Sequence, residues 1–149
     1  MDTLKPDARR RVMQANRGRT RSERAFASAV WASGVRYLTP DGFRARYGAR
    51  LPGNPDMLFP GVHLAVFVDG CFWHGCRKCR RYPKTRWAFW RGKFERNRRR
   101  DAAVNRALMR AGWKVVRIPE HAIRSDDRRR AFAERLARRL RTMMRQRRG

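Results

Sequence analysis

The apolar run VHLAVFVD, Val62 to Asp69, has the pattern of a β-strand that is covered on both faces. From Leu64 to Val68 the apolar side chains occupy odd and even positions alike, whereas a strand with one solvated face alternates apolar and polar residues. Such a strand lies inside a sheet with helices on either side. Candidate strands and helices flank the run in the sequence, which predicts an α/β sandwich: a central mixed β-sheet flanked by helices.

Segments on both sides of this strand carry their own patterns. Thr20 and Glu23 have capping-box spacing, and apolar residues follow at helical intervals up to Gly34, which predicts a first helix over about residues 21–33. The segment VRYLTPDGFRARY suggests a hairpin with Pro40-Asp41-Gly42 as its turn. The later patterns predict a strand in LPGNPDMLF, a long helix from Lys84 to Gly112, a strand in WKVVRIP and a final helix over about residues 127–147.

The chain is extremely basic. Its 149 residues include 39 Lys plus Arg against 12 Asp plus Glu, a formal net charge of +27, and all but five of the basic residues are arginine. The planar guanidinium forks of arginine suit bidentate contacts with phosphate. The hydrophobic content of 42% nevertheless supports a folded core. These properties favour a folded protein whose partner is a polyanion, above all nucleic acid.

Residues 1–19 are polar and arginine-rich and are expected to form a flexible basic arm, with residues 20–149 forming a single domain. No apolar run is long enough to span a bilayer, and the N-terminus lacks the apolar segment of a signal peptide. A cytoplasmic protein with no membrane partner is therefore expected.

All three cysteines lie within nine positions, in the spacing Cys71-x4-Cys76-x2-Cys79. They cannot pair among themselves, and a cytosolic setting disfavours disulfides. Three thiolates so close together could occupy three corners of a zinc tetrahedron. The alternative is three unrelated thiols, the more common state of free cysteines.

The fourth zinc ligand could be any of the three histidines. His74 lies inside the cysteine-rich loop but would crowd Cys76. His121 follows the strand WKVVRIP, and a sheet neighbour could bring it back to the loop. We favour His121 over His74 and His63 for that reason.

Carboxylates are scarce in this chain, so their positions are informative. Asp56 opens the strand in LPGNPDMLF, and Asp69 ends the strand in VHLAVFVD. If these strands pair, the two side chains can meet at one edge of the sheet, where carboxylates, water and a substrate phosphate could bind Mg²⁺. Taken singly, each aspartate could instead be a turn residue.

Other candidates each have a plainer alternative. Glu23 could be only part of the capping box, and Asp101 only an ion-pair partner of neighbouring arginines. His74 suits a proton carrier because its ordinary pKa is about 6.5. The aromatic residues near the cysteines could be core residues, or they could stack on bases or wedge between them; these residues are Phe72, Trp73, Trp87 and Trp90.

Five segments, in order, resemble the very-short-patch-repair (Vsr) mismatch endonucleases: LPGNPDMLF, VFVDGCFWHGC, PKTRWAFW, NRRRDAAV and AGWKVVRIPEHAI. The resemblance extends from about Arg10 to Ile123. It implies a restriction-endonuclease-like fold and Mg²⁺-dependent nicking of DNA on the 5′ side of the thymine in a T·G mismatch. Such mismatches arise when 5-methylcytosine deaminates.

The resemblance also implies roles for individual residues. It places the catalytic magnesium on Asp56 and on the backbone carbonyl of Val68, and it makes His74 the catalytic histidine. Glu23 and Asp101 match the supporting acids of the family. Where the best-known member has Thr-His before Gly-Cys-Phe-Trp, this chain has Val68-Asp69, so a histidine role passes to a carboxylate.

The structural zinc of the family maps onto Cys71, Cys76, Cys79 and His121, the last replacing a cysteine, and the base-wedging residues map onto Phe72, Trp73, Trp90 and Met13. The implied partner is double-stranded DNA with a T·G mismatch, bound by a monomer, with mismatch-repair proteins as further partners. Two alternatives stay open: a restriction-type nuclease of the same fold, and a non-catalytic, zinc-stabilised nucleic-acid-binding protein. Carboxylates facing phosphates favour an enzyme, because a pure binder has no use for them.

Overall fold

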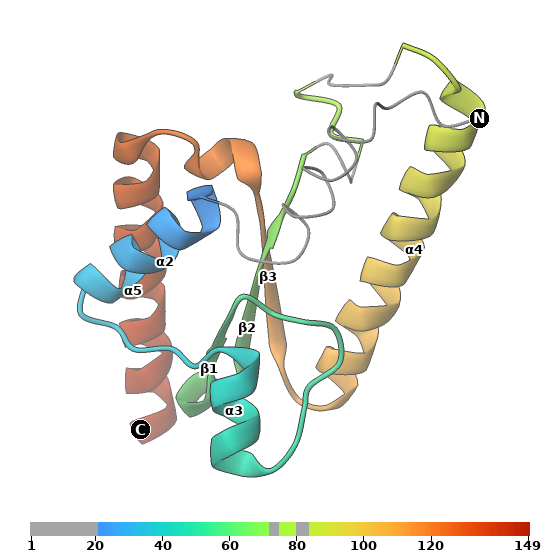
Figure 1. The fold of residues 1–149 in the computed structure, drawn as a ribbon. Helices are drawn as coiled ribbons and strands as arrows, with labels where there is room; N and C mark the ends of the chain where they lie inside the picture. Colours follow the sequence, from blue (N-terminus) through green and yellow to red (C-terminus); the bar gives the residue numbers. More distant parts are fainter. Residues whose placement is uncertain (1–20, 72–74, 80–83) are drawn as a thin grey trace.

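The computed structural model describes residues 21–71, 75–79 and 84–149, so the predicted arm over residues 1–19 lies outside the described residues. Three strands and four α-helices make up the described part, with two short 3₁₀ helices (Figure 1). The elements, in chain order, are α2 (Arg21–Ala32), α3 (Pro40–Tyr47), β1 (Met57–Phe59), η1 (Pro60–Val62), β2 (Leu64–Asp69), α4 (Trp87–Arg110), β3 (Lys114–Pro119), η2 (Glu120–Ile123) and α5 (Asp126–Arg148).

The sheet is mixed and has the strand order β1-β2-β3. β1 pairs antiparallel with β2, with Met57 opposite Val66, and β2 pairs parallel with β3, with Phe67 opposite Arg117. The predicted mixed sheet is therefore confirmed. The central strand β2 is buried from Leu64 to Val68, as its continuous apolar run predicts.

Helices cover both faces of the sheet (Figure 1). α2 and α5 pack on the face that carries Leu64, Val66 and Val68, whereas α3 and α4 pack on the face that carries Ala65 and Phe67. The helical residues buried on these faces are Phe26 and Val30 of α2, Leu136 and Leu140 of α5, Phe43 of α3 and Leu108 of α4. This layering confirms the α/β sandwich.

The hairpin expected around Pro40-Asp41-Gly42 is wrong, because these residues begin helix α3. The Thr39 hydroxyl accepts a hydrogen bond from the Gly42 amide at 3.1 Å, and Pro40 occupies the first helical turn. Proline is well suited to that position because its missing N–H would have no helical partner there. The helix ends at Gly48, whose φ of 71° is readily adopted by glycine.

The long helices agree with the sequence patterns, and the central strand is shorter than expected. α2, α4 and α5 fall within one to three residues of their predicted bounds. β2 begins at Leu64 rather than Val62, because Val62 belongs to η1 and His63 turns the chain with a φ of 50°. None of the helices in the described part of the chain is long and apolar enough to cross a membrane.

Candidate functional site

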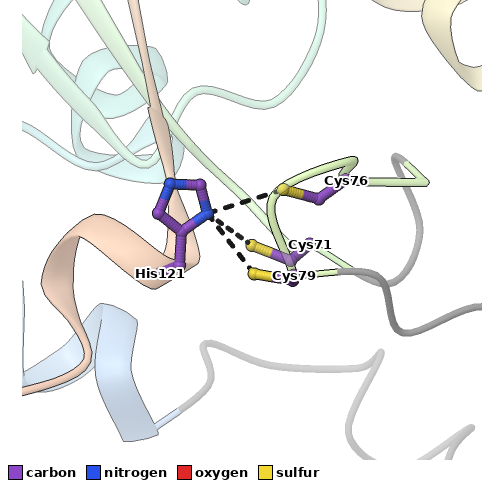
Figure 2. A group of neighbouring side chains, drawn as sticks. All are labelled: Cys71, Cys76, Cys79 and His121. Carbon is purple, nitrogen blue, oxygen red and sulfur yellow. Dashed lines mark hydrogen bonds between the residues drawn. The ribbon is translucent and has the colours of Figure 1, made fainter.

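Three thiols and one imidazole converge at the end of the sheet. The Sγ atoms of Cys71, Cys76 and Cys79 lie 3.3, 3.5 and 3.5 Å from Nδ1 of His121 (Figure 2). The four potential ligand atoms all lie within 4.8 Å of one another. We call these four residues the thiol–imidazole cluster. Three sulfurs and one ring nitrogen at such separations form a donor set that fits a tetrahedral metal ion.

The pairing of the strands brings the cluster together. Cys71 follows the end of β2, and His121 lies in η2, immediately after β3. Because β2 and β3 run parallel, their carboxyl ends meet at the same edge of the sheet. The loop then turns back, and the Cys76 amide donates a hydrogen bond to the Cys71 carbonyl at 3.0 Å. Residues 50 positions apart in the sequence therefore become neighbours.

The same loop packs against helix α4 at Gly75. Gly75 has a φ of 56°, and a Cβ atom added there would lie 2.8 Å from Cδ2 of Phe94. Both the backbone conformation and the close approach require glycine. The cysteine-rich loop is thus positioned from two sides, by the thiol–imidazole cluster and by α4.

The local environment sets the protonation of the cluster in the metal-free protein. Burial raises the pKa of the Cys71 thiol to about 11, and only 3% of this residue is exposed. A hydrogen bond from the Cys79 backbone amide lowers the pKa of Cys76. Burial also lowers the pKa of His121, and the positive charge of Lys78 acts in the same direction. His121 is therefore neutral at pH 7, which is the form that binds metals.

The other two histidines have different places. His63 precedes β2, and its ring stacks on Trp113 with a centroid separation of 5.3 Å. His74 lies outside the described residues. His121 is thus the histidine that the described structure brings to the three thiols, as the sequence argument favoured.

Asp56 lies at the same edge of the sheet, just before β1 begins. Its Oδ2 accepts a hydrogen bond from the Val68 amide at 2.7 Å, and its own amide donates to the Val66 carbonyl at 2.8 Å. Because β1 has no further residue to pair with Val68, the Asp56 carboxylate satisfies the Val68 N–H instead. The side chain is therefore fixed where the β1–β2 ladder ends.

The carbonyl of Val68 points toward the same place. In a β-strand, the N–H and C=O of one residue point to the same neighbouring strand, and successive residues alternate. The Val66 carbonyl and the Val68 amide both face the β1 side. The Val68 carbonyl consequently faces the edge occupied by Asp56, so a carboxylate and a backbone carbonyl are offered there together.

Asp69 and Asp101 meet through a shared arginine. Nη1 of Arg117 lies 2.9 Å from Oδ1 of Asp69 and 3.7 Å from Oδ1 of Asp101. The acids come from β2 and α4, and the arginine comes from β3. By strand alternation Asp56 and Asp69 share the face of Phe67, the face that α4 covers.

Arg117 is the residue at this edge that the sequence arguments missed. Besides the two acids, it donates from Nε to Oδ1 of Asn105 at 2.8 Å, and its guanidinium lies 4.2 Å from the centroid of the Phe67 ring. A signal was present in the sequence. Arg117 is a charge inside the apolar run VVRIP, and buried charges need partners.

The remaining candidates lie in or next to helices, or outside the described chain. Glu23 lies, half-buried, in the first turn of α2. Trp90 lies in the first turn of α4, with its ring centroid 6.2 Å from that of Phe94 and with Lys93 over its face. Four predicted site residues lie outside the described residues: Met13, Phe72, Trp73 and His74.

A mixed sheet with acids at one edge, helices on both faces and a strong positive charge has the character of a nuclease-like α/β protein. The family model described as DNA mismatch endonuclease Vsr matches residues 1–81. The chain therefore belongs to the Vsr family.

Individual relatives agree with this assignment. The chain is 44% identical over 114 residues to the type II nicking enzyme V.NaeI of Lentzea aerocolonigenes, covering 76% of this chain and 68% of that enzyme. It is 41% identical over 118 residues to the type II nicking enzyme V.XorIIP of Xanthomonas oryzae pv. oryzae, covering 77% and 81%. It is also similar to the DNA mismatch endonuclease Vsr of Escherichia coli, at 33% identity over 107 residues, covering 70% and 64%.

Proposed function

We propose that this protein is a DNA mismatch endonuclease that nicks one strand on the 5′ side of the thymine in a T·G mismatch. The observation that carries the proposal is the Asp56 carboxylate, which the Val68 amide holds where the β1–β2 ladder ends, on the face of the sheet that also carries Asp69. Membership of the Vsr family supports DNA as the substrate and endonucleolytic hydrolysis as the reaction. The names of the relatives support nicking and mismatch recognition.

The cofactor we propose for the reaction is Mg²⁺. A carboxylate oxygen of Asp56 and the backbone oxygen of Val68 are hard ligands, the type that Mg²⁺ prefers together with water and substrate phosphate. Bound there, the ion would supply Lewis-acid stabilisation of the charge that develops on the scissile phosphate. The protein fixes its own ligands in advance, because the Val68 amide holds the Asp56 carboxylate in place.

The proton-transfer roles follow from the chemistry of hydrolysis. A water molecule must lose a proton as it attacks phosphorus, and the leaving 3′ oxygen must gain one. We assign proton transfer at the phosphate to His74, with Glu23 and Asp101 as supporting acids. Asp69 takes the position at which a family member has histidine, and in this chain it is ion-paired to Arg117. We assign Asp69 the role of orienting neighbouring groups through its ion pair with Arg117.

DNA recognition is proposed to combine charge with aromatic wedges. The net charge of +27 supplies affinity for the phosphate backbone that is independent of sequence. Phe72, Trp73 and Trp90, with Met13 from the arm, are proposed to enter the base stack beside the mismatch. A mismatched pair is easier to unstack than a matched pair, which would favour insertion at the lesion.

A structural zinc ion is proposed for the thiol–imidazole cluster. The donor set of three sulfurs and one imidazole nitrogen matches zinc in identity and number, and all four residues are protein ligands, which leaves no open position for catalysis. Zinc would hold the ends of β2 and β3 and the loop between Cys71 and Cys79. The loop carries Phe72, Trp73 and His74, so zinc would position both the wedge and the proton carrier.

The test uses a panel of end-labelled duplexes that are identical except at one base pair. The protein is incubated with each duplex and Mg²⁺, and any nick is mapped to the nucleotide. Nicking 5′ of the thymine in the T·G duplex, with no cut in the matched duplex, is expected. Cutting of the matched duplex at a fixed sequence would instead identify a restriction-type nuclease. Tight binding of all duplexes with no nick would identify a non-catalytic binding protein.

A further inference from the structure

The side chain of Arg117 joins three elements of the fold beside the candidate catalytic edge. It starts on β3, reaches Asp69 of β2 at 2.9 Å and donates to Asn105 of α4 at 2.8 Å. Its Nη2 lies 3.5 Å from the Asp101 carbonyl, and its Nη1 lies 3.7 Å from the Asp101 carboxylate. The guanidinium therefore uses its Nε, Nη1 and Nη2 atoms on different partners.

The Phe67 ring packs against one face of the guanidinium, in addition to the hydrogen bonds at its edge. One face lies 4.2 Å from the centroid of the Phe67 ring, and Phe67 is the register partner of Arg117 across the β2–β3 ladder. Only 19% of the side chain is exposed. The guanidinium of arginine is planar, so it can stack on an aromatic ring while its N–H groups donate in fixed directions, and the ammonium of lysine can do neither. The structure thus specifies arginine at this position, and a positive charge alone would not reproduce it.

The two acids that share Arg117 come from opposite layers. Asp69 belongs to the sheet, whereas Asp101 belongs to the helix that covers it, one helical turn before Asn105. Arg117 lies between the carboxylate of Asp69 on the sheet and that of Asp101 on α4. Its positive charge reduces the repulsion between these two negative charges. By strand alternation Asp56 lies on the same face of the sheet as Asp69. Arg117 offsets part of the negative charge of Asp69 and Asp101 beside the edge at which a phosphate is proposed to bind.

From these contacts we infer that Arg117 is a positioning residue for the nicking reaction: it holds the carboxylates of Asp69 and Asp101 in place beside the edge that carries Asp56, and it offsets one of their charges. The inference rests on the proposed function, because it assigns a role within the same site. Arg117 acts through the acids and is not assigned any contact with DNA.

The test compares Arg117→Met and Arg117→Lys with the unaltered protein on the T·G duplex. Arg138→Met is the matched control, since Arg138 is an exposed arginine of α5, the helix on the opposite face of the sheet, and its side chain makes no hydrogen bond or ion pair among residues 21–71, 75–79 and 84–149. Two quantities are measured separately: the single-turnover nicking rate and the dissociation constant of the duplex. A positioning role lowers the nicking rate and leaves the dissociation constant of the duplex almost unchanged. A purely structural or purely electrostatic role would change both quantities.

Arg117→Met is expected to lower the nicking rate about 100-fold, the size of effect that misplacement of reacting groups by about 1 Å produces. Its duplex affinity should stay within about threefold of the unaltered value, close to the effect of removing one distant phosphate contact. Arg117→Lys should recover part of the rate, because it restores the charge but not the fork. Arg138→Met should leave the nicking rate unchanged.

Folding is monitored by circular dichroism and thermal unfolding. If Arg117→Met does not fold, Arg117→Lys provides the test, alone and in the pair Asp69→Asn/Arg117→Lys. The pair should nick no more slowly than the slower of the single variants Asp69→Asn and Arg117→Lys, because residues that act as one unit are not additive. A folded Arg117→Met or Arg117→Lys that nicks at the unaltered rate, or a pair whose losses multiply, would overturn the inference. If the unaltered protein nicks no duplex at all, the proposed function itself fails.

Discussion

The Val68 amide donates a hydrogen bond to Oδ2 of Asp56 at 2.7 Å, at the point where β1 stops pairing with β2. A side-chain carboxylate thus accepts the next hydrogen bond of the β1–β2 ladder, in place of a backbone carbonyl. This contact serves two purposes. It satisfies an amide that would otherwise lack a backbone partner, and it aims the carboxylate at the edge where the Val68 carbonyl also points.

Replacement of Asp56 should separate its structural role from its proposed catalytic role. Asp56→Asn retains a side-chain oxygen that can accept from the Val68 amide, so its free energy of unfolding should stay within about 1 kcal/mol of the unaltered protein. Its nicking rate should nevertheless fall by at least about 1,000-fold, because a neutral amide cannot hold Mg²⁺ as a carboxylate does. Nicking assays on the T·G duplex and chemical denaturation check the two parts.

Asp56→Ala is the companion variant. It removes the acceptor as well as the charge, and leaving the Val68 amide unpaired should lower the free energy of unfolding by a further 1 kcal/mol or so, about the net worth of one hydrogen bond. Duplex binding should persist in both variants. Nicking by Asp56→Ala at the unaltered rate would remove Asp56 from the metal site.

His121→Ala should reduce the zinc bound per protein molecule and lower the melting temperature, because metal binding and folding are coupled. Elemental analysis of the purified protein and thermal unfolding measure the two effects. His63→Ala is the matched control: its ring stacks on Trp113, away from the thiols, so zinc content should not change. Full zinc content in His121→Ala would show that a different residue completes the site.

The pH dependence of zinc binding should report the buried thiol. In the metal-free protein the pKa of Cys71 is raised to about 11, so Cys71 is protonated at neutral pH and must release its proton on binding zinc. The apparent affinity should therefore rise about tenfold per pH unit for each proton released, between about pH 7 and pH 9. Competition with a chelator of known affinity at several pH values measures this slope.

The metal-free protein should show the opposite trend in stability. Because folding raises the pKa of Cys71 above its ordinary value, the protonated thiol contributes stability that is fully present below the ordinary pKa. That contribution is lost as the pH rises toward 11. Cys71→Ala should abolish this loss, and a metal-free protein whose melting temperature rose over the same range would contradict the assignment of burial as the cause.

Trp90→Ala should weaken mismatch discrimination more than overall affinity for DNA. Trp90 lies in the first turn of α4, half-buried, with Phe89 and Phe94 on either side. Loss of a wedge should reduce the preference for the T·G duplex over the matched duplex about tenfold, since base–aromatic stacking contributes about 1–3 kcal/mol. Equilibrium binding to both duplexes measures the ratio of the two affinities.

The control is Trp31→Ala, which removes an exposed tryptophan of α2 and should leave this ratio unchanged. Equal losses on both duplexes with Trp90→Ala would assign it to packing.

Local patterns were sufficient to predict β2 and the long helices. The continuous apolar run of β2 and the helical periodicity of α5 are properties of consecutive residues, and burial follows directly from them. The segment at Pro40 was predicted wrongly because Pro-Asp-Gly suits a turn, while Thr-Pro suits a helix start equally well. Packing of Phe43 against Trp113 favours the helix, and that contact spans 70 positions of sequence.

The candidate site was predictable where one segment carries several reactive residues, as around Cys71. The approach of His121 to that segment depended on the choice of a parallel neighbour for β2, which the sequence could only suggest. Arg117 was not predicted, because its partners Asp69 and Asp101 lie 48 and 16 positions away and no local pattern joins them. Side-chain networks across layers are set by tertiary packing alone.

The parallel register of β2 and β3 positions two groups of side chains at once: the Arg117–Asp69 ion pair and the thiol–imidazole cluster. Sliding β3 by one residue would turn Arg117 to the other side of the sheet and release Asp69. The same slip would displace His121 from the thiols. One change in the pairing of these two strands would therefore disturb the acids of the sheet and the thiol–imidazole cluster together.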